Sequence, residues 1–300
     1  MSVLTYLREG LSHKNGVVRK ASVAFLGIPR FVARWQNSSQ LLKRRPPILA
    51  NSFPKSGTHL LAQIAEGLTE DTNFGAFLAS QVSSFQLRER SRESTLRFIR
   101  GFVRGEVVRG HLYFAPEFAA ALQEMNAVNY FIYRDPRDVV VSEAHYLREM
   151  NRWHRLHRYF SRTQSIEEAI LLSINGFNPP IAGISYPNIA ERFARYEGWL
   201  SCETCLPVRF EDLVSENREA VLKQITDHYL AHTVGGPDAG VALERAKSKI
   251  APEKSHTFRS GRKAAWQREF TPALRRRFGE LAGDLLIRLG YEHDLNWIDE

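Results

Sequence analysis

The sequence predicts an α/β protein built around a parallel β-sheet. A short apolar run at residues 48–50 follows two prolines and is typical of a buried parallel strand, and the chain from Thr58 onward has the apolar spacing of a helix. A second apolar, β-favouring run at residues 128–133 is followed by Pro136, which is placed to open another helix. Two strand–loop–helix units of this kind favour parallel strands with helices packed on them.

Length and composition indicate one globular domain. The chain has 300 residues, 43% of them hydrophobic, and a formal net charge of +8, which suits an anionic ligand, a nucleic acid or an acidic membrane surface equally well. Cys202 and Cys205 are too few for a disulfide framework, so a reducing compartment is the simpler interpretation. No run of about 18 apolar residues and no signal-peptide pattern is present, so we expect a cytoplasmic protein.

Residues 1–45 predict a basic amphipathic helical segment ahead of the domain at residues 46–300. One or two helices are expected, packed on the domain or attached to an anionic membrane surface. In the membrane interpretation Phe31 and Trp35 are buried among the lipids. The side chains facing the headgroups are then Arg30, Arg34, Lys43, Arg44 and Arg45.

The loop between the first strand and its helix predicts an anion site. Backbone N–H groups and the positive end of the helix point at one place, Gly57 permits close approach, and Lys55 adds a full charge. Compared with the nucleotide-binding pattern G-x-x-x-x-G-K-[ST], Ser52 replaces the first glycine, Thr58 the lysine and His59 the magnesium-binding hydroxyl. We therefore expect an anion site that works without a metal. On these residues alone, a simple turn feeding a helix remains the alternative.

Phe53-Pro54-Lys55-Ser56-Gly57-Thr58 closely resembles the 5′-phosphosulfate loop of sulfotransferases, which use 3′-phosphoadenosine 5′-phosphosulfate (PAPS) as donor. The family's loop continues with Thr-Trp, whereas this chain continues with His59-Leu60, which removes the aromatic ring expected to lie against adenine. The resemblance implies that the following residues bind the donor: Lys55, Ser56, Gly57, Thr58 and His59.

Residues 105–112 predict a short strand that ends at Arg109, with His111 just past its end. In open α/β sheets, ligands bind beyond the carboxyl ends of the strands. A lone histidine is more often structural than catalytic, but Arg109-Gly110-His111-Leu112 resembles the Lys-Thr-His-Leu segment of cytosolic sulfotransferases, whose histidine is the catalytic base. The resemblance therefore implies that His111 is the base and that Lys55 stabilises the leaving phosphate.

The segment from Arg134 to Ser142 resembles the family's Arg-Asn-Pro-x-Asp-x-x-x-Ser sequence, in which the first Arg and the last Ser bind the 3′-phosphate. The resemblance implies the same role for Arg134 and Ser142. Because Ser142 lies about two helical turns into the helix, both side chains reach one phosphate only if the loop folds back. The alternative is a salt-bridged loop that involves Asp135 and Asp138.

Two later segments complete the resemblance. Phe210-Glu211-Asp212-Leu213 follows another short strand and is similar to the family's Tyr-Glu-Asp-Leu, whose aromatic ring lies near adenine; Phe210 keeps the ring and loses the hydroxyl. Residues 257–271 resemble Arg-Lys-Gly-x-x-Gly-Asp-Trp-Lys-x-x-Phe-Thr, a loop that closes on the 3′-phosphate. That likeness implies that Arg259 and Gly261 bind the 3′-phosphate.

The resemblance implies a P-loop-like sulfotransferase fold, a central parallel sheet flanked by helices, with the first strand–loop–helix unit at its centre. The implied reaction is in-line transfer of a sulfuryl group from PAPS to an acceptor hydroxyl, or an amine, with a histidine base of near-neutral pKa and no metal. The acceptor is a small molecule, a glycan or a lipid, held by residues 74–104 and 145–186.

Competing classes explain fewer of these features. A P-loop-like nucleotide kinase would need magnesium and the lysine and hydroxyl that Thr58 and His59 replace. A nucleic-acid-binding protein would show a recognisable module, and none is visible, so no nucleic-acid partner is expected. His154 and His157 have the spacing of metal ligands but lack further ligands. Another phosphate-binding protein remains an alternative.

Overall fold

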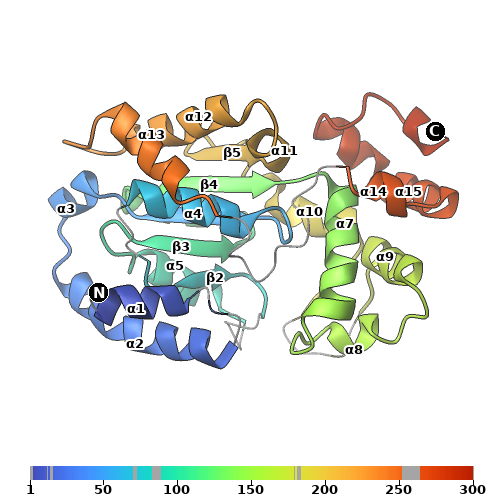
Figure 1. Cartoon of the computed structure of the whole chain (residues 1–300), viewed down its shortest axis with the longest axis horizontal. Helices are drawn as coiled ribbons and strands as arrows, with labels where there is room; N and C mark the ends of the chain where they lie inside the picture. The colour runs from blue at the N-terminus through green and yellow to red at the C-terminus, as the bar shows by residue number, and fades with distance from the viewer. Residues whose placement is uncertain are drawn as a thin grey trace.

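A computed structural model describes residues 3–11, 13, 16–69, 73–82, 89–178, 180, 184–251 and 264–299. Within these residues, five strands form one sheet in the order β2-β3-β1-β4-β5, and every neighbouring pair is parallel. The predicted fold class is therefore confirmed, and the first predicted strand is the central one (Figure 1). The strands are β1 (Ile48–Ser52), β2 (Phe77–Ala79), β3 (Val107–His111), β4 (Val128–Tyr133) and β5 (Cys205–Arg209).

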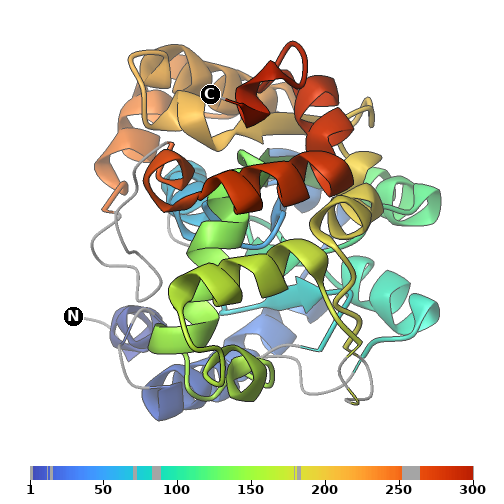
Figure 2. The ribbon, with the colours of Figure 1, turned by 90° about the vertical axis from the view of Figure 1, so that its right-hand side faces the viewer.

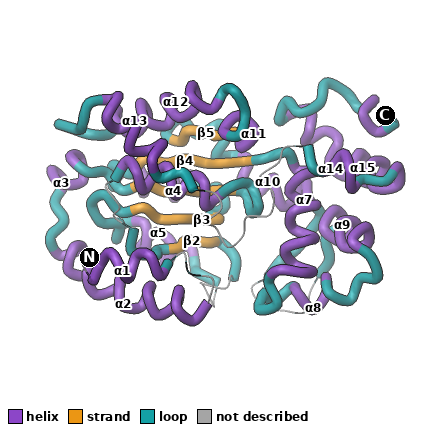
Figure 3. The backbone as a smooth tube through the Cα atoms, viewed as in Figure 1, coloured by secondary structure: helices purple, strands orange, loops and turns teal. Residues whose placement is uncertain are grey.

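Alternate residues of the central strands face two hydrophobic layers, because successive side chains of a strand point to opposite faces. Ile48 and Ala50 of β1 pack with the first layer of helices, and Leu49 packs with the second. Figure 3 shows the sheet enclosed by helices. The first layer contains α4 (Thr58–Leu68), α12 (Arg218–Ala231) and α13 (Ala239–Ser248). The second contains α5 (Arg92–Ile99), α6 (Pro116–Glu124) and α10 (Ile189–Glu197), and its core continues into α7 (Pro136–His145), α9 (Ile166–Asn175) and α15 (Pro272–Arg288).

The carboxyl end of β1 lies at the topological switch point of the sheet. The chain connections run to β3 on one side of β1 and to β4 on the other. This is the position at which open α/β sheets bind ligands. The strands point toward a group of helices that contains α7, α9 and α15, which Figures 1 and 2 show beyond the carboxyl edge of the sheet. Short elements complete that side: η1 (Tyr146–Met150), α8 (His157–Phe160), α11 (Phe210–Leu213), α14 (Trp266–Glu269) and η3 (Asn296–Ile298).

The strand that carries His111 is longer than predicted. We expected it to end at Arg109, but β3 continues through His111 because Ala79 of β2 pairs with His111. His111 is thus the last residue of the strand rather than the first residue of a loop. Pairing with β2, including the hydrogen bond from the Ser80 N–H to the His111 carbonyl, fixes its backbone more firmly than a loop would.

The N-terminal segment forms three helices and packs on the domain. They are α1 (Val3–Gly10), α2 (Gly16–Trp35) and α3 (Ser39–Arg44). Leu26 of α2 is fully buried against Phe74 and Val103. The expectation that Arg30 and Arg45 face lipid headgroups is wrong: Arg30 binds the fully buried Glu106 at 2.5 Å, and Arg45 donates to the Thr69 carbonyl. In the described part of the chain, no helix is long and apolar enough to cross a bilayer.

Candidate active site

The loop between β1 and α4 has the backbone of an anion cradle. Lys55 and Gly57 both have positive φ, 69° and 101°, so the chain turns sharply before the first residue of α4, Thr58. A Cβ atom at position 57 would lie 2.7 Å from the Phe210 ring and 3.2 Å from Ile132. Glycine is therefore required here, because the backbone has a positive φ and because a side chain would clash with Phe210. Phe210, the first residue of α11, lies against the cradle.

Ser56 and Lys55 give the cradle its polar groups. Ser56 is fully buried, and its Oγ atom has no hydrogen-bond partner among the described residues. Because a buried hydroxyl is costly to leave unpaired, this atom fits a ligand oxygen placed in the loop. The Lys55 ammonium lies 3.7 Å from the centre of the Tyr146 ring, on the π-helical turn that follows α7. These residues fit a phosphate or sulfate group.

His111 has its ring orientation fixed by Ser52. Its Nδ1 atom lies 3.1 Å from the Ser52 carbonyl oxygen and 3.0 Å from Ser52 Oγ. A carbonyl oxygen only accepts hydrogen bonds, so Nδ1 carries the ring proton. Nε2 of His111 is consequently the nitrogen that can accept a proton.

The pKa of His111 is lowered to about 4, mainly by burial and also by the charges of Lys55 and Arg109, while the Ser52 carbonyl and the charge of Glu143 oppose the change. This differs from the near-neutral pKa that we expected from sequence, because packing around the half-buried imidazole at the end of β3 disfavours its charged form. The imidazole is accordingly neutral at pH 7. A neutral imidazole is the form that accepts a proton.

Ser52 joins the histidine to the loop helix. Its Oγ atom lies 2.6 Å from Thr58 Oγ1 and 3.0 Å from His111 Nδ1. The Ser52 hydroxyl donates its proton either to the Gly110 carbonyl, at 3.2 Å, or to Thr58 Oγ1. Sequence reasoning treated Ser52 only as a replacement for a glycine. The β-favouring run that places Ser52 at the end of β1 is the one sequence signal for this role.

The loop after β4 brings Arg134 to the same place. Arg134 donates to Asp138 at 2.9 Å, and its guanidinium lies 4.7 Å from the centre of the Phe210 ring, which in turn covers Gly57. The structure thus gathers Arg134, Phe210 and the β1–α4 loop. Ser142 lies farther along α7 and is partly buried.

The β4–α7 loop is also salt-bridged, as its alternative interpretation proposed. Asp135 caps the start of α7 and binds Arg137, and Arg137 binds Glu292 at 2.5 Å. Both arginines of the loop are nearly buried. Because each charge has a partner, the loop holds Arg134 in place without leaving an uncompensated buried carboxylate.

Asp138 also holds the start of the last part of the chain. It accepts hydrogen bonds from the backbone N–H groups of Ala264 and Trp266, each at 2.9 Å. Arg259 and Gly261 lie outside the described residues. The chain re-enters the described structure at Ala264, beside the carboxylate that binds Arg134.

The two residues at which the loop departs from the family lie in the first turn of α4. His59 and Leu60 are partly buried, and Leu60 packs against the hydrophobic layer formed by α4, α12 and α13. The aliphatic side chain therefore serves the core of this protein. Within the described ranges, no group of three or more His, Cys, Asp or Glu side chains is placed to hold a metal ion.

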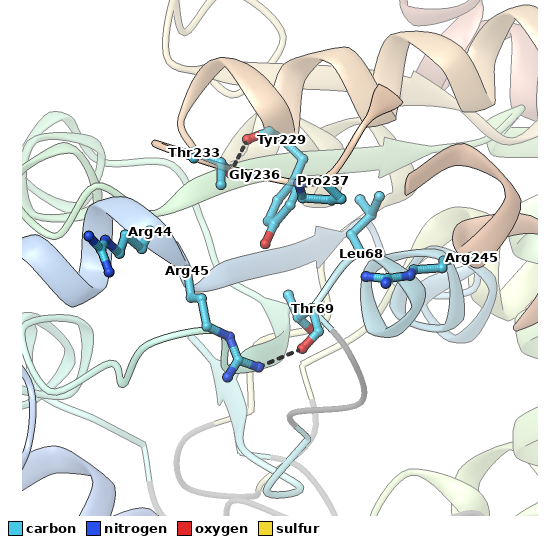
Figure 4. Close-up of a pocket in the computed structure, with 10 residues that line it drawn as sticks. Arg44, Arg45, Leu68, Thr69, Tyr229, Thr233, Gly236, Pro237 and Arg245 are labelled. Atoms are coloured by element: carbon cyan, nitrogen blue, oxygen red, sulfur yellow. Dashed lines mark hydrogen bonds between the residues drawn. The ribbon is translucent and has the colours of Figure 1, made fainter. Parts of the chain in front are cut away.

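A basic pocket of about 330 Å³ lies at the other end of the sheet. Figure 4 shows Arg44, Arg45 and Arg245 around it, with Tyr229 between them. Arg45 precedes β1 and Thr69 follows α4, so this pocket is at the amino ends of the strands. It is separate from the loop that carries Lys55.

Comparisons with known proteins agree with this geometry. The sulfotransferase domain family matches residues 45–290, whereas no curated protein matches the sequence. The fold is similar to mouse sulfotransferase SULT7A1, solved with adenosine 3′,5′-bisphosphate (PAP), at a TM-score of 0.55 and 20% identity over 80% of this chain and 84% of the other. It is also similar to retinol dehydratase, solved with retinol and PAP, at a TM-score of 0.54 and 14% identity over 86% of each chain. The family match over most of the chain, together with this fold, shows that the protein belongs to the sulfotransferase domain family, as the motifs predicted.

Proposed function

We propose that this protein transfers a sulfuryl group from PAPS to a hydroxyl group, or less readily an amine, with His111 as the base. The observation that carries the proposal is the half-buried, neutral His111, whose Nδ1 proton is held by Ser52 at the end of the strand that leads into the phosphate loop. Residues 46–300 are the sulfotransferase domain in this proposal.

The donor is held by groups from four segments. Lys55, Ser56 and the N–H groups that lead into α4 hold the 5′-phosphosulfate, with Thr58 and His59 in the first turn. Phe210 lies beside this loop and offers its ring to the adenine. The proposed ligands of the 3′-phosphate are Arg134, Ser142, Arg259 and Gly261. Two neighbours of the same fold were solved with PAP, the product that remains when PAPS loses its sulfuryl group, which supports this donor.

The reaction requires one bond to form as another breaks. The acceptor oxygen attacks sulfur while the bond between sulfur and the bridging phosphate oxygen breaks, and PAP leaves with that electron pair. The acceptor's proton passes to Nε2 of His111, which contributes roughly 10²- to 10⁴-fold in rate. Lys55 stabilises the charge on the departing oxygen, and such a group contributes on the order of 10²- to 10³-fold. The proposal requires no metal.

The acceptor is proposed to be a small molecule, a glycan or a lipid. Solved complexes of retinol dehydratase contain retinol and androsterone, which supports a small-molecule acceptor. Residues 145–186 are proposed to form part of its pocket, next to four rings of this segment that pack together, those of Tyr159, Phe160, Phe177 and Tyr186.

Calorimetric titration tests the donor site. We expect PAP to bind without magnesium, 5′-AMP and ATP to bind at least tenfold more weakly, and Arg134→Ala to abolish the preference for PAP while Arg134→Lys keeps part of it. His111→Gln should bind PAP normally and lose roughly 10²- to 10⁴-fold in transfer rate in an acceptor screen with radiolabelled PAPS. Equal affinity for PAP and 5′-AMP, or a requirement for magnesium, would contradict the proposal and favour a kinase or another phosphate-binding protein.

A further inference from the structure

Helix α2 carries a stripe of exposed apolar side chains. Phe25, Ile28, Phe31 and Trp35 follow one another at intervals of three or four residues, and each is at least 60% exposed. This spacing places them on one face of the helix. We call these four residues the α2 stripe. Val17 and Val32 extend it, and Val3 and Tyr6 of α1 are also exposed.

The α2 stripe is not the face that attaches the helix to the domain. The opposite face carries Leu26, which is fully buried, and Arg30, which binds the buried Glu106. Ser22 packs against Gly10 of α1. The helix is thus held on the protein from one side and presents apolar side chains on the other. Figures 1 and 2 show α1 and α2 on the outside of the molecule, at the β2 edge of the sheet.

The same segment contains the whole net charge of the chain. Residues 1–45 have nine Lys or Arg residues and one acidic residue, a net charge of +8, and the whole chain also has a net charge of +8. Residues 46–300 accordingly have 32 basic and 32 acidic residues, a net charge of zero. Exposed basic side chains lie near the stripe on α2 and α3: Lys20, Arg34, Lys43 and Arg44.

We propose that α1, α2 and α3 dock in the plane of an anionic lipid bilayer, with the α2 stripe among the acyl chains and the basic side chains at the headgroups. A contiguous exposed apolar patch marks a contact with a protein or a membrane. The concentration of net positive charge in the same segment favours the membrane, because basic side chains beside an apolar face characterise helices that bind anionic bilayers. A nucleic acid would use the charge and leave the stripe unexplained.

This docking holds the catalytic domain in a fixed orientation. The Arg30–Glu106 pair and buried Leu26 fix α2 to Phe74, Val103 and Glu106, and β3, which carries His111, follows directly at Val107. The proposal concerns the outer face of α2, which carries none of the proposed donor ligands, and does not depend on sulfuryl transfer.

Vesicle sedimentation of the full chain tests the proposal. We expect binding to phosphatidylcholine vesicles that contain phosphatidylserine, weak binding to pure phosphatidylcholine, and a loss of binding at high salt. Phe31→Ser with Trp35→Ser should lower the partition coefficient at least tenfold. Lys20→Gln with Lys43→Gln should lower it roughly tenfold or more on the anionic vesicles alone.

A matched pair of substitutions controls for the loss of exposed apolar surface. Val241 on α13 and Ile287 on α15 are exposed as well, and Val241→Ser with Ile287→Ser should leave vesicle binding unchanged. PAP binding should be the same in all these variants, which separates this test from the test of the enzyme. Equal sedimentation of the wild type and the Phe31/Trp35 variant would overturn the proposal. A wild-type dimer that this variant converts to a monomer, without any vesicle binding, would overturn it in favour of a second copy of the chain.

Discussion

The loop after β1 and the loop after β4 both join a buried parallel strand to a helix, but their polar groups are arranged differently. In the first loop the buried Ser56 hydroxyl has no partner among the described residues, and Lys55 rests on the ring of Tyr146. In the second loop Arg134 is paired with Asp138, and Arg137 with Asp135 and Glu292. The first loop leaves the Ser56 hydroxyl available, whereas the arginines of the second loop are each paired with a carboxylate.

This difference separates effects on ligand affinity from effects on the free energy of unfolding. A donor without a partner lowers stability and gains a hydrogen bond only when a ligand arrives. A buried charge with a partner is already stabilised in the folded protein. Removing that partner leaves an uncompensated buried charge, which strongly destabilises the fold. Substitution of the unpaired Ser56 hydroxyl should therefore change ligand affinity, and substitution of the buried carboxylates of the second loop should change the free energy of unfolding.

Asp138→Ala should have the largest effect. The Asp138 carboxylate is completely buried and accepts three hydrogen bonds, from Arg134 and from the N–H groups of Ala264 and Trp266. Removing one member of a buried pair costs about 3–5 kcal/mol, so urea denaturation should show a loss of that size in the free energy of unfolding.

Asp227→Ala is the matched control for Asp138→Ala. Asp227 also binds a basic side chain four residues away, but both members of its pair with Lys223 are exposed. We expect a loss of at most about 0.5 kcal/mol, because exposed helical pairs contribute little. Similar losses for the two variants would show that the β4–α7 loop is not stabilised by its internal charges.

The contrast between the loops also marks the limit of the sequence prediction. The two strand–loop–helix units were predictable because apolar runs, Gly57 and Pro136 are local signals. The hydrogen bond between Ser52 and His111 joins residues 59 positions apart, and the ion pair between Arg30 and Glu106 spans 76. No local periodicity reports such contacts. For this reason the membrane interpretation of the sequence places Arg30 among the headgroups, although its position on α2 faces the domain.

The pKa of His111 shows the same limit. A strand end was predicted, and strand ends of open sheets are often accessible. The burial of His111 depends on all the residues that pack around the end of the strand. These include Phe77, whose ring centre lies 5.3 Å from that of the imidazole. The motif therefore implied the role of the residue, and the tertiary structure determined its charge state.

Ser56→Ala should have the next largest effect, on affinity alone. We expect PAP to bind roughly 10- to 100-fold more weakly, the value of a hydrogen bond to a charged group, while the free energy of unfolding stays the same or rises slightly. Calorimetry and urea denaturation measure the two quantities. Ser173→Ala is the control, because Ser173 is equally buried but is bound to Glu143, Tyr186 and Arg192.

Ser173→Ala should show the opposite pattern: a loss of about 1–3 kcal/mol in the free energy of unfolding and unchanged affinity for PAP. If Ser56→Ala destabilised the protein and left PAP binding intact, the Ser56 hydroxyl would be a structural group, and the first loop would resemble the second.

Tyr146→Leu should have the smallest effect and tests whether the two units cooperate. Tyr146 follows the helix of the second unit, yet its ring lies against the Lys55 ammonium of the first, and its hydroxyl accepts a hydrogen bond from Asn151. A cation held against an aromatic face gains about 0.5–2 kcal/mol. If the ring positions Lys55 for the departing phosphate, loss of the ring should lower the transfer rate at saturating acceptor roughly 2- to 30-fold.

Tyr146→Phe separates positioning from packing, because it keeps the ring and loses the hydrogen bond from Asn151. We expect Tyr146→Phe to retain nearly the wild-type rate and Tyr146→Leu to lose it, with PAP affinity changed little in both. Equal rates for the two variants would mean that the ring does not position Lys55. The first loop would then orient its lysine through its own backbone, in which Lys55 already has a positive φ.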